Sequence, residues 1–558
     1  MKNIILTAFL LTLFACSQKQ QYDTIIRNGM VYDGNGGEPY KADIGINADT
    51  IAFIGDLSKA TGKTETDAKG QAVAPGFVNM LSQSDVALLH DGTSQGDIRQ
   101  GVTLEVMGEG GSAGPLNARM KQEAQTGAWG DIKFAVDWNT LGEYLTGLEK
   151  KGVSCNVASF VGAAEVRDYV MGEDDRAPAP AELDSMKAQV ALAMREGAMG
   201  VSTALIYPPG FFAKTDELVV LSKVASAYNG MYISHMRSEG NNLLQAVDEL
   251  ITIAKQANIH AEIFHLKAGG KDNWYKMDTV FKKVDSANKA GLHITADMYT
   301  YLAGATGMTA AFPPTLQDGG FGKLWQRLHD PAVRAAMKKA MTSPGNGWEN
   351  LYYGAGSPEK VLLLGFRLDS LKKYNGKTLA EAARLRNSTP EETAINLIVE
   401  DSTRVEVAYF LMNEDNVKKQ LAQPWVSIGS DAPSLNTTDS AFLKSSEHPR
   451  AFGNFARLLG LYARDEKVLP LQQAIYKLAK LPATNLKLQK RGELAVGNYA
   501  DVVVFNPATI ADHATYDKPF QYATGVEQVF VNGVQVLKDG EHTGAKPGRF
   551  IKGPGYGK

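Results

Sequence analysis

Cysteine is scarce in this chain, with only Cys16 and Cys155 among 558 residues. The sequence also has no long run of lysine and arginine, and its formal net charge is -3. The material for a disulfide framework and the basic surface that follows a phosphate backbone are therefore both missing. We expect no intrachain disulfide and no nucleic-acid partner. The remaining composition, with 44% hydrophobic and 21% charged residues, is typical of a globular enzyme.

The first residues carry a short apolar run at positions 4–14, preceded by the positive charge of Lys2. This run is too short to span a bilayer comfortably and is typical of an export signal. It ends in Leu13-Phe14-Ala15-Cys16, which resembles the lipobox of bacterial lipoproteins. We therefore expect a signal peptide at 1–15 and a lipidated tether at 16–21. Acyl chains on Cys16 would anchor the chain to a membrane of the bacterial cell envelope, facing the periplasm or the cell surface. The alternative is an ordinary signal peptide followed by an incidental cysteine.

The chain length favours two folding units, a large α/β barrel and a smaller domain. Short strands are indicated near the start, at 22–32, 42–46 and 50–55, and again near the end, at 500–505 and 526–536. Asn532-Gly533 divides the last of these runs and is a strong hairpin signal. We expect one small β-sandwich domain formed from both chain termini, residues 22–72 and 486–558, the latter including a C-terminal tail.

Between these ends, apolar runs rich in β-branched residues alternate with helical stretches, which indicates parallel βα units. The candidate barrel strands are residues 73–81, 104–109, 154–162, 199–207, 231–235, 260–265, 294–298 and 426–431. Helices are predicted between them, for example at 181–196 and 243–256. The predicted fold class is therefore α/β, with a (β/α)₈ TIM barrel over 73–485. The interval 302–424 is longer than one crossover needs, so we expect an insertion of helices and loops over one end.

Polar groups that suit a metal site stand at the ends of four predicted strands. They are Glu109, His235, His265 and Asp431. Active sites of such barrels form at the carboxyl ends of the strands, and the whole chain has only nine histidines. The alternatives are structural: both histidines could be hydrogen-bonded wall residues of the barrel, and Glu109 could simply face water.

Two imidazoles and one carboxylate form a three-ligand set that leaves a position for water, as in catalytic zinc sites. We therefore predict one divalent metal, zinc by preference, held by Glu109, His235 and His265. A bound divalent metal lowers the pKa of its water to about 7. Asp431 is the candidate general acid and base that removes and returns the proton.

The chain resembles the N-acyl-D-amino-acid deacylase (D-aminoacylase) branch of the amidohydrolase superfamily from about residue 22 to residue 540. The segments that carry the resemblance are Pro75-Gly76-Phe77, Gly101-Val102-Thr103, Ser234-His235-Met236-Arg237-Ser238-Glu239-Gly240, Phe264-His265-Leu266-Lys267, Gly429-Ser430-Asp431, His448-Pro449-Arg450 and Ala500-Asp501-Val502-Val503-Val504-Phe505. The resemblance implies a (β/α)₈ barrel with a β-sandwich, and hydrolysis of an N-acyl amino acid.

Residue by residue, the resemblance makes His235 and His265 ligands of the tightly bound metal, and Asp431 the catalytic aspartate. Glu109 stands where some members have a cysteine ligand. Arg450 and Tyr299 resemble the groups that hold the substrate carboxylate, a task that suits a guanidinium. A surface salt bridge for Arg450 and a packed wall aromatic for Tyr299 are the structural alternatives. Lys267 is a further candidate for contact with substrate.

One departure from the family pattern concerns strand one. Leu81 and Gln83 occupy the positions of the superfamily's His-x-His signature. Leucine cannot bind a cation and glutamine is a poor zinc ligand, so we expect the second metal site to be absent or very weak. Either one metal suffices for catalysis, or the protein keeps a binding pocket without turnover. The presence of Asp431 favours an enzyme.

The sequence therefore predicts a metal-dependent hydrolase that cleaves the amide bond of a small N-acyl amino acid. Hydrolysis of another small amide, a dipeptide, a cyclic amide or a lactone is an alternative on the same scaffold. A surface lipoprotein that binds a ligand without turnover is the alternative from another class, and metal analysis separates it from an enzyme. A purely structural role at the envelope is a weaker alternative.

Overall fold

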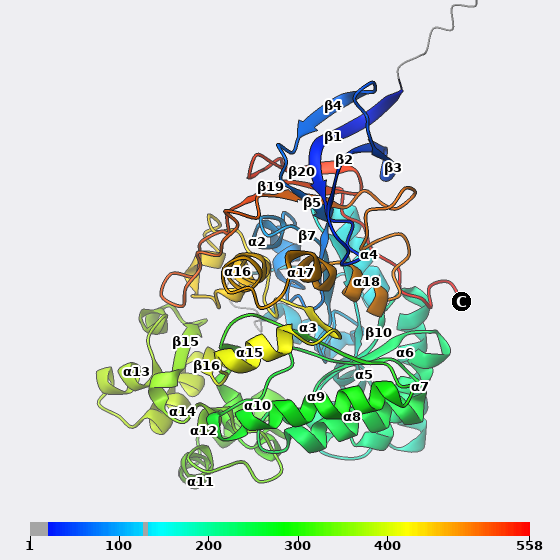
Figure 1. The fold of residues 1–558 in the computed structure, drawn as a ribbon. Coiled ribbons are helices and arrows are strands. Elements are labelled where there is room, and N and C mark those ends of the chain that lie inside the picture. The colour runs from blue at the N-terminus through cyan, green and yellow to red at the C-terminus, as the bar shows by residue number, and fades with distance from the viewer. Residues whose placement is uncertain (1–19, 127–131) are drawn as a thin grey trace, which may run out of the picture.

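The computed structural model describes residues 20–126 and 132–558. The signal peptide and the lipidation of Cys16 lie outside these residues. Over the described ranges, no helix combines the length and the apolar character that a membrane crossing requires. Figure 1 shows a β-sheet made from the two ends of the chain, a barrel beside it, and a lobe formed by the yellow-green segment at the lower left.

The sheet made from the chain ends, called the terminal sheet below, has nine strands. Its strands are β1 (Gln21–Val31), β2 (Tyr40–Asn47), β3 (Thr50–Gly55), β4 (Thr61–Asp67), β5 (Ala72–Pro75), β18 (Val502–Phe505), β19 (Val526–Val531), β20 (Val534–Lys538) and β21 (Glu541–His542). They follow the order β21-β20-β19-β18-β5-β1-β2-β3, with β4 paired to β1. The two chain ends meet where β18 pairs antiparallel with β5. The predicted hairpin joins β19 to β20, where Asn532 and Gly533 have φ angles of 47° and 79°, as a two-residue hairpin turn with both angles positive requires.

The barrel has eight strand positions. They are β6 (Phe77–Asn79), β7 (Val102–Met107), β8 (Asn156–Ser159) continued by β9 (Val161–Gly162), β10 (Gly200–Ala204), β11 (Met231–His235), β12 (Ala261–Ile263), β13 (Ile294–Met298) and β17 (Val426–Ile428). Neighbouring strands pair in parallel from β6 to β8 and from β9 to β17. The first and last strands meet through a 3.2 Å hydrogen bond from Met80 N to Ile428 O and a bridge between Ser82 and Ala432. The predicted (β/α)₈ barrel with a β domain from both termini is confirmed.

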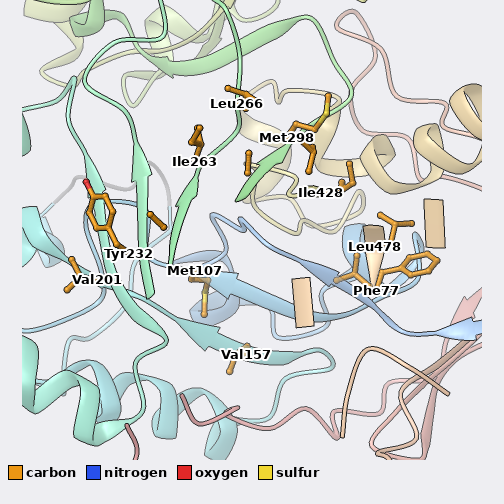
Figure 2. Close-up of a cluster of buried hydrophobic side chains, with 14 of the residues drawn as sticks. Phe77, Met107, Val157, Val201, Tyr232, Ile263, Leu266, Met298, Ile428 and Leu478 are labelled. Atoms are coloured by element: carbon orange, nitrogen blue, oxygen red, sulfur yellow. The ribbon is translucent and has the colours of Figure 1, made fainter. Parts of the chain in front are cut away.

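Side chains alternate across the barrel wall, as the two-residue period of a strand requires. Met231 and Ile233 of β11 belong to the same buried cluster as Val106 of β7 and Phe264, which fills the barrel interior. Tyr232 belongs to the larger cluster between strands and helices. The labelled residues of Figure 2 belong to this outer cluster, and most of them come from the barrel strands, while Leu478 comes from helix α17 (Leu471–Leu478). His235 has the parity of Met231 and Ile233, so it points into the barrel at the carboxyl end of β11.

The helices outside the barrel follow the strands in chain order. They are α1 (Ala87–His90), α2 (Gln95–Ile98), α3 (Ala118–Thr126), α4 (Leu141–Lys151), α5 (Ala163–Met171), α6 (Pro180–Glu196), α7 (Thr215–Ala227), α8 (Leu243–Ala257), α9 (Met277–Lys289), α15 (Glu414–Leu421), α16 (Arg450–Arg457), α17 (Leu471–Leu478) and α18 (Lys480–Asn485). Helix α8 buries Leu243, Val247, Leu250 and Ile253, which recur at the three- and four-residue spacing of one helix face.

The inserted lobe lies between β13 and β17. It consists of β14 (Ala303–Gly307), β15 (Val361–Gly365), β16 (Glu406–Phe410), α10 (Gly320–Arg327), α11 (Pro331–Met341), α12 (Leu351–Ala355), α13 (Leu379–Leu385) and α14 (Pro390–Asp401). Its three strands form an antiparallel sheet in the order β14-β16-β15, which the expectation of helices and loops had missed. Val361, Leu363 and Val407 belong to a buried cluster made almost entirely of residues from this lobe. The lobe therefore has a hydrophobic core of its own.

Candidate metal centre and active site

Glu109 reaches the barrel mouth because of the glycines on either side of it. It follows β7 in the segment Gly108-Glu109-Gly110, where both glycines have positive φ angles, 94° and 71°. A Cβ atom at Gly108 would lie 2.4 Å from Phe160 O, and one at Gly110 would lie 2.4 Å from Ala204 Cβ. Only glycine fits at these two positions, and the tight path turns the carboxylate inward. The Glu109 side chain is 11% exposed, so it does not simply face water.

The structure brings Glu109, His235 and His265 into one cluster. Glu109 Oε1 lies 3.0 Å from His235 Nδ1 and 2.7 Å from His265 Nε2. One candidate ligand atom from each residue lies within 4.8 Å of the others, and the two imidazole rings meet edge to face with centroids 4.5 Å apart. Among the described residues, this is the one group of histidine, cysteine and acidic side chains with such spacing. Three strand ends thus converge on one point.

Glu239 lies behind both imidazoles. Its Oε1 is 3.0 Å from His265 Nδ1 and its Oε2 is 3.7 Å from His235 Nε2, while Lys267 Nζ donates to Oε1 over 2.7 Å. Each imidazole therefore faces Glu109 with one nitrogen and Glu239 with the other. A carboxylate behind a histidine is the arrangement that fixes the ring and tautomer of a metal ligand.

The electrostatics of the cluster show that it needs positive charge. Burial raises the pKa of Glu109, but the adjacent His265 and His235 outweigh burial and hold that pKa well below its usual value. Burial and Lys267 lower the pKa of His265, but Glu239 and Glu109 together raise it to about 10. Two buried carboxylates around two imidazoles thus favour positive charge at this point. A divalent metal fits the same donor set, because neutral imidazole and carboxylate are the ligands of catalytic zinc.

Asp431 stands beside the cluster and is held from two sides. Its Oδ2 lies 2.8 Å from Arg450 Nη1, and its Oδ1 accepts a 3.2 Å hydrogen bond from Gln83 Nε2. Gln83 Nε2 also donates to Glu109 Oε2 over 2.6 Å. The backbone N–H of Asp431 donates to Leu81 O, and its φ angle of 50° is left-handed. Such backbone strain in a non-glycine residue is typical of functional positions.

Arg450, Tyr299 and Lys267 form a group of buried donors next to Asp431. The Arg450 guanidinium stacks over the Tyr299 ring at 4.4 Å, and Lys267 Nζ lies 5.5 Å from the same ring. The Tyr299 hydroxyl and Arg450 Nε are buried without a hydrogen-bond partner. Unpaired buried donors are costly, so an anionic group that satisfies them would bind well here. Arg450 is 2% exposed, which excludes the surface salt bridge considered from the sequence.

Sequence reasoning missed three groups at the site. Glu239 lies four residues after His235, and its loop position gives no strand-end signal. Gln83 is half-buried and links two carboxylates, although the sequence marks it only as a lost ligand. Asp297 of β13 accepts from the His265 backbone N–H over 2.9 Å. Its position near the end of a predicted strand was a usable signal.

The inserted lobe reaches the same mouth. Glu349, which follows α11, accepts a 2.5 Å hydrogen bond from Ser238 Oγ, beside Glu239. Arg404 lies 5.2 Å from the Tyr207 ring, and that ring lies 5.2 Å from the His235 ring. The lobe therefore contributes polar groups to the rim of the site.

Comparison with known proteins finds relatives of one family along nearly the full length of the chain. The profile of the amidohydrolase family matches residues 64–537. The D-aminoacylase of Alcaligenes xylosoxydans xylosoxydans is 32% identical over 543 residues, which cover 96% of this chain and 98% of that protein. The N-acyl-D-glutamate deacylase of the same organism is 30% identical over 535 residues, with 96% and 97% coverage.

Two solved structures extend this likeness. A D-aminoacylase structure that addresses one-metal activation and second-metal attenuation of a binuclear centre superposes with a TM-score of 0.78. It is 29% identical and covers 95% of this chain and 100% of its own. The N-acyl-D-glutamate deacylase of Bordetella bronchiseptica, in complex with zinc and a phosphonate mimic of the tetrahedral intermediate, gives 0.79 at 27% identity, with 96% and 100% coverage.

Proposed function

Because this chain belongs to the amidohydrolase family and is a hydrolase of amide C–N bonds, we propose that it hydrolyses N-acyl-D-amino acids to a carboxylate and a free D-amino acid. The relatives that share nearly its full length carry the names D-aminoacylase and N-acyl-D-glutamate deacylase. The single observation that carries the proposal is the adjacency of three groups. The cluster of Glu109, His235 and His265 stands next to Asp431, and Asp431 stands next to the donors of Arg450 and Tyr299.

This adjacency suits a substrate that carries both an amide and a carboxylate. Arg450 and Tyr299 supply unpaired buried donors for the carboxylate, and Lys267 adds positive charge nearby. A dipeptide with a free carboxylate would also meet these donors, whereas a lactone or cyclic amide without a carboxylate would leave them unpaired. These donors therefore favour an N-acyl amino acid over the cyclic substrates.

Asp431 is the proposed general base and acid. As the amide is attacked, an oxygen of its carboxylate takes one proton from the attacking water. When the C–N bond breaks, Asp431 returns that proton to the leaving nitrogen, so that a free amine departs and the carboxylate is restored. Arg450 and Gln83 hold the two Asp431 oxygens in place during this exchange.

The proposed cofactor is a single divalent metal, zinc by preference, held by Glu109, His235 and His265. When bound, it supplies a Lewis acid that polarises the amide carbonyl and lowers the pKa of water to about 7. Glu239 fixes the two imidazoles from behind, and Lys267 balances the charge of Glu239.

The test is a substrate screen with the protein lacking residues 1–16. We expect amine release from N-acyl-D-amino acids, little release from the L-enantiomers, and none from the matching amides that lack a carboxylate. In Asp431→Asn, kcat falls by about 10² to 10⁴ while the metal content stays that of the wild type. Absence of amine release across the D-series would overturn the substrate assignment, and full turnover by Asp431→Asn with bound metal would overturn the mechanism.

We also propose that the chain is exported and anchored to the cell envelope by lipid on Cys16. The support is the apolar run that ends in Leu13-Phe14-Ala15-Cys16. In a bacterial host fed radiolabelled palmitate, the wild type is expected to incorporate label and to sediment with membranes. Cys16→Ser should lose both properties, and unlabelled wild-type protein would contradict the proposal.

A further inference from the structure

We propose that the side-chain amide of Gln83 takes the place of a second cation in this site, joining Glu109 to Asp431 and restricting the protein to one metal ion. The inference deepens the proposed function, because it assigns a positioning role for the same catalytic aspartate. It concerns a residue that the sequence marks only as an unsuitable ligand.

The contacts of Gln83 are those of a small cation between two carboxylates. Its Nε2 lies 2.6 Å from Glu109 Oε2 and 3.2 Å from Asp431 Oδ1. Glu109 Oε1 faces the two imidazoles, so the two oxygens of this carboxylate have different partners. The oxygen that a second metal would need is thus already bound by an N–H group.

The identity of the Gln83 atom at this point follows from its neighbours. Both contacts are carboxylate oxygens, which accept hydrogen bonds when ionised, and the amide nitrogen has two protons to donate. The amide oxygen in this position would face two negative charges without a proton between them. The nitrogen therefore points at the carboxylates, and each N–H has one acceptor.

The surroundings of Gln83 offer a second ion few other ligands. Leu81, two residues earlier in the segment that follows β6, is fully buried, and its side chain has no atom that binds a cation. The Gln83 backbone N–H donates to Ala432 O over 3.1 Å, and Ser82 forms a bridge with the same residue. The main chain thus fixes Gln83 to the segment after β17 that carries Asp431. The Gln83 side chain adds a second contact with this segment through its hydrogen bond to Asp431.

This arrangement has a consequence for Asp431. With Gln83 on Oδ1 and Arg450 on Oδ2, the carboxylate has one fixed orientation without a second ion. The protein therefore holds its general base in position with its own side chains and not with a second metal ion. Its activity should therefore not depend on the concentration of zinc beyond the first equivalent.

The direct test is the number of zinc ions bound per chain, measured by equilibrium dialysis and elemental analysis of the folded protein lacking residues 1–16. We expect one equivalent for the wild type and two for Gln83→Glu, which offers a third carboxylate, and for Gln83→His, which offers an imidazole. The matched control is Gln528→Glu in the terminal sheet. Gln528 is a buried glutamine whose Nε2, like that of Gln83, donates to an aspartate, Asp539 Oδ1 at 2.9 Å, and its variant should keep one equivalent.

A second equivalent in either Gln83 variant, with one in the wild type and the control, supports the inference. Two equivalents or none in the wild type would overturn it, as would one equivalent in both Gln83 variants. The zinc count uses no substrate, so its result is independent of the proposed deacylase activity. A wild type that releases D-amino acids while holding two zinc ions would remove this inference alone.

The positioning role has its own readout. Gln83→Leu removes one charge-assisted hydrogen bond to Asp431, so kcat should fall by about tenfold or more. KM should stay close to the wild-type value, because Gln83 does not contact the donors proposed for the substrate carboxylate, Arg450 and Tyr299. An unchanged kcat, or a change confined to KM, would show that Gln83 does not position Asp431.

Discussion

The buried carboxylate behind the two imidazoles makes a specific prediction about metal affinity. In Glu239→Gln the shape of the side chain is kept, but its negative charge is lost. His265 Nδ1 then loses a carboxylate at 3.0 Å, His235 Nε2 loses one at 3.7 Å, and Lys267 Nζ keeps only the imidazole at 2.7 Å. The site thus becomes more positive without losing a first-sphere ligand.

The magnitude follows from the role of such partners. Loss of a carboxylate that orients a metal-binding histidine typically costs about 10- to 100-fold in metal affinity. This corresponds to about 1.4 to 2.7 kcal/mol. Because Glu239 faces both histidines and also balances Lys267, we expect the upper half of this range. The assay is competition for zinc with a chromophoric chelator, which gives Kd without any substrate.

A matched control separates this effect from general instability. Glu217 is also a buried carboxylate, 2.7 Å from the buried guanidinium of Arg167, but on α7 and away from the metal cluster. Removing one partner of such a pair costs about 3 to 5 kcal/mol of stability. Glu217→Gln should therefore melt at lower temperature and keep the wild-type Kd for zinc. If Glu239→Gln also kept that Kd, the assignment of Glu239 as the partner of both imidazoles would be refuted.

Three further predictions test other parts of the structure. Arg450→Lys loses the planar guanidinium fork, so KM for N-acyl-D-amino acids should rise by about tenfold or more, measured by amine release; an unchanged KM would place the carboxylate elsewhere. Chelation of the metal should lower the melting temperature in calorimetry, since Glu109 and Glu239 would face each other across the imidazoles without the ion, and added zinc should restore it; a melting temperature indifferent to chelator would contradict the site. Burial lowers the pKa of Lys477 from 10.5 to about 8. Between pH 8 and pH 10.5 the unfolded chain therefore binds more protons at this group than the folded chain, so the free energy of unfolding rises with pH over this range. The unfolding free energy of the wild type relative to Lys477→Met should therefore increase by about 3 kcal/mol from pH 8 to pH 10.5 in urea titrations, and a constant difference would refute the cause.

The parts of the fold that sequence could predict are those with local signals. β-branched runs indicated the barrel strands, and the spacing of Leu243, Val247 and Leu250 indicated α8. Parallel strand ends meet at one mouth, and this rule was enough to select Glu109, His235, His265 and Asp431 together. Asn532-Gly533 predicted its hairpin because two positive φ angles are cheap for these residues.

The parts that sequence did not predict depend on contacts between distant segments. Gln83 and Asp431 are 348 residues apart, and no local pattern indicates that an amide will lie between two carboxylates. Glu239 lies in a loop behind the two imidazole rings, and a loop has no periodic sequence pattern that would predict this position. The antiparallel sheet of the inserted lobe was missed because its strands are short and separated by helices, so that β14 and β16 are far apart in sequence.

The pairing of β5 with β18 makes the first and last parts of the polypeptide depend on each other. During synthesis, residues 72–75 have no partner on one side until residues 502–505 have been made, so the closing contact spans most of the chain. Contacts of this kind slow folding, because a long loop must close before the contact forms. The nascent chain therefore lacks a finished fold until its synthesis is almost complete. Deleting the last sixty or so residues would leave β5 an open edge, and an exposed edge strand promotes aggregation.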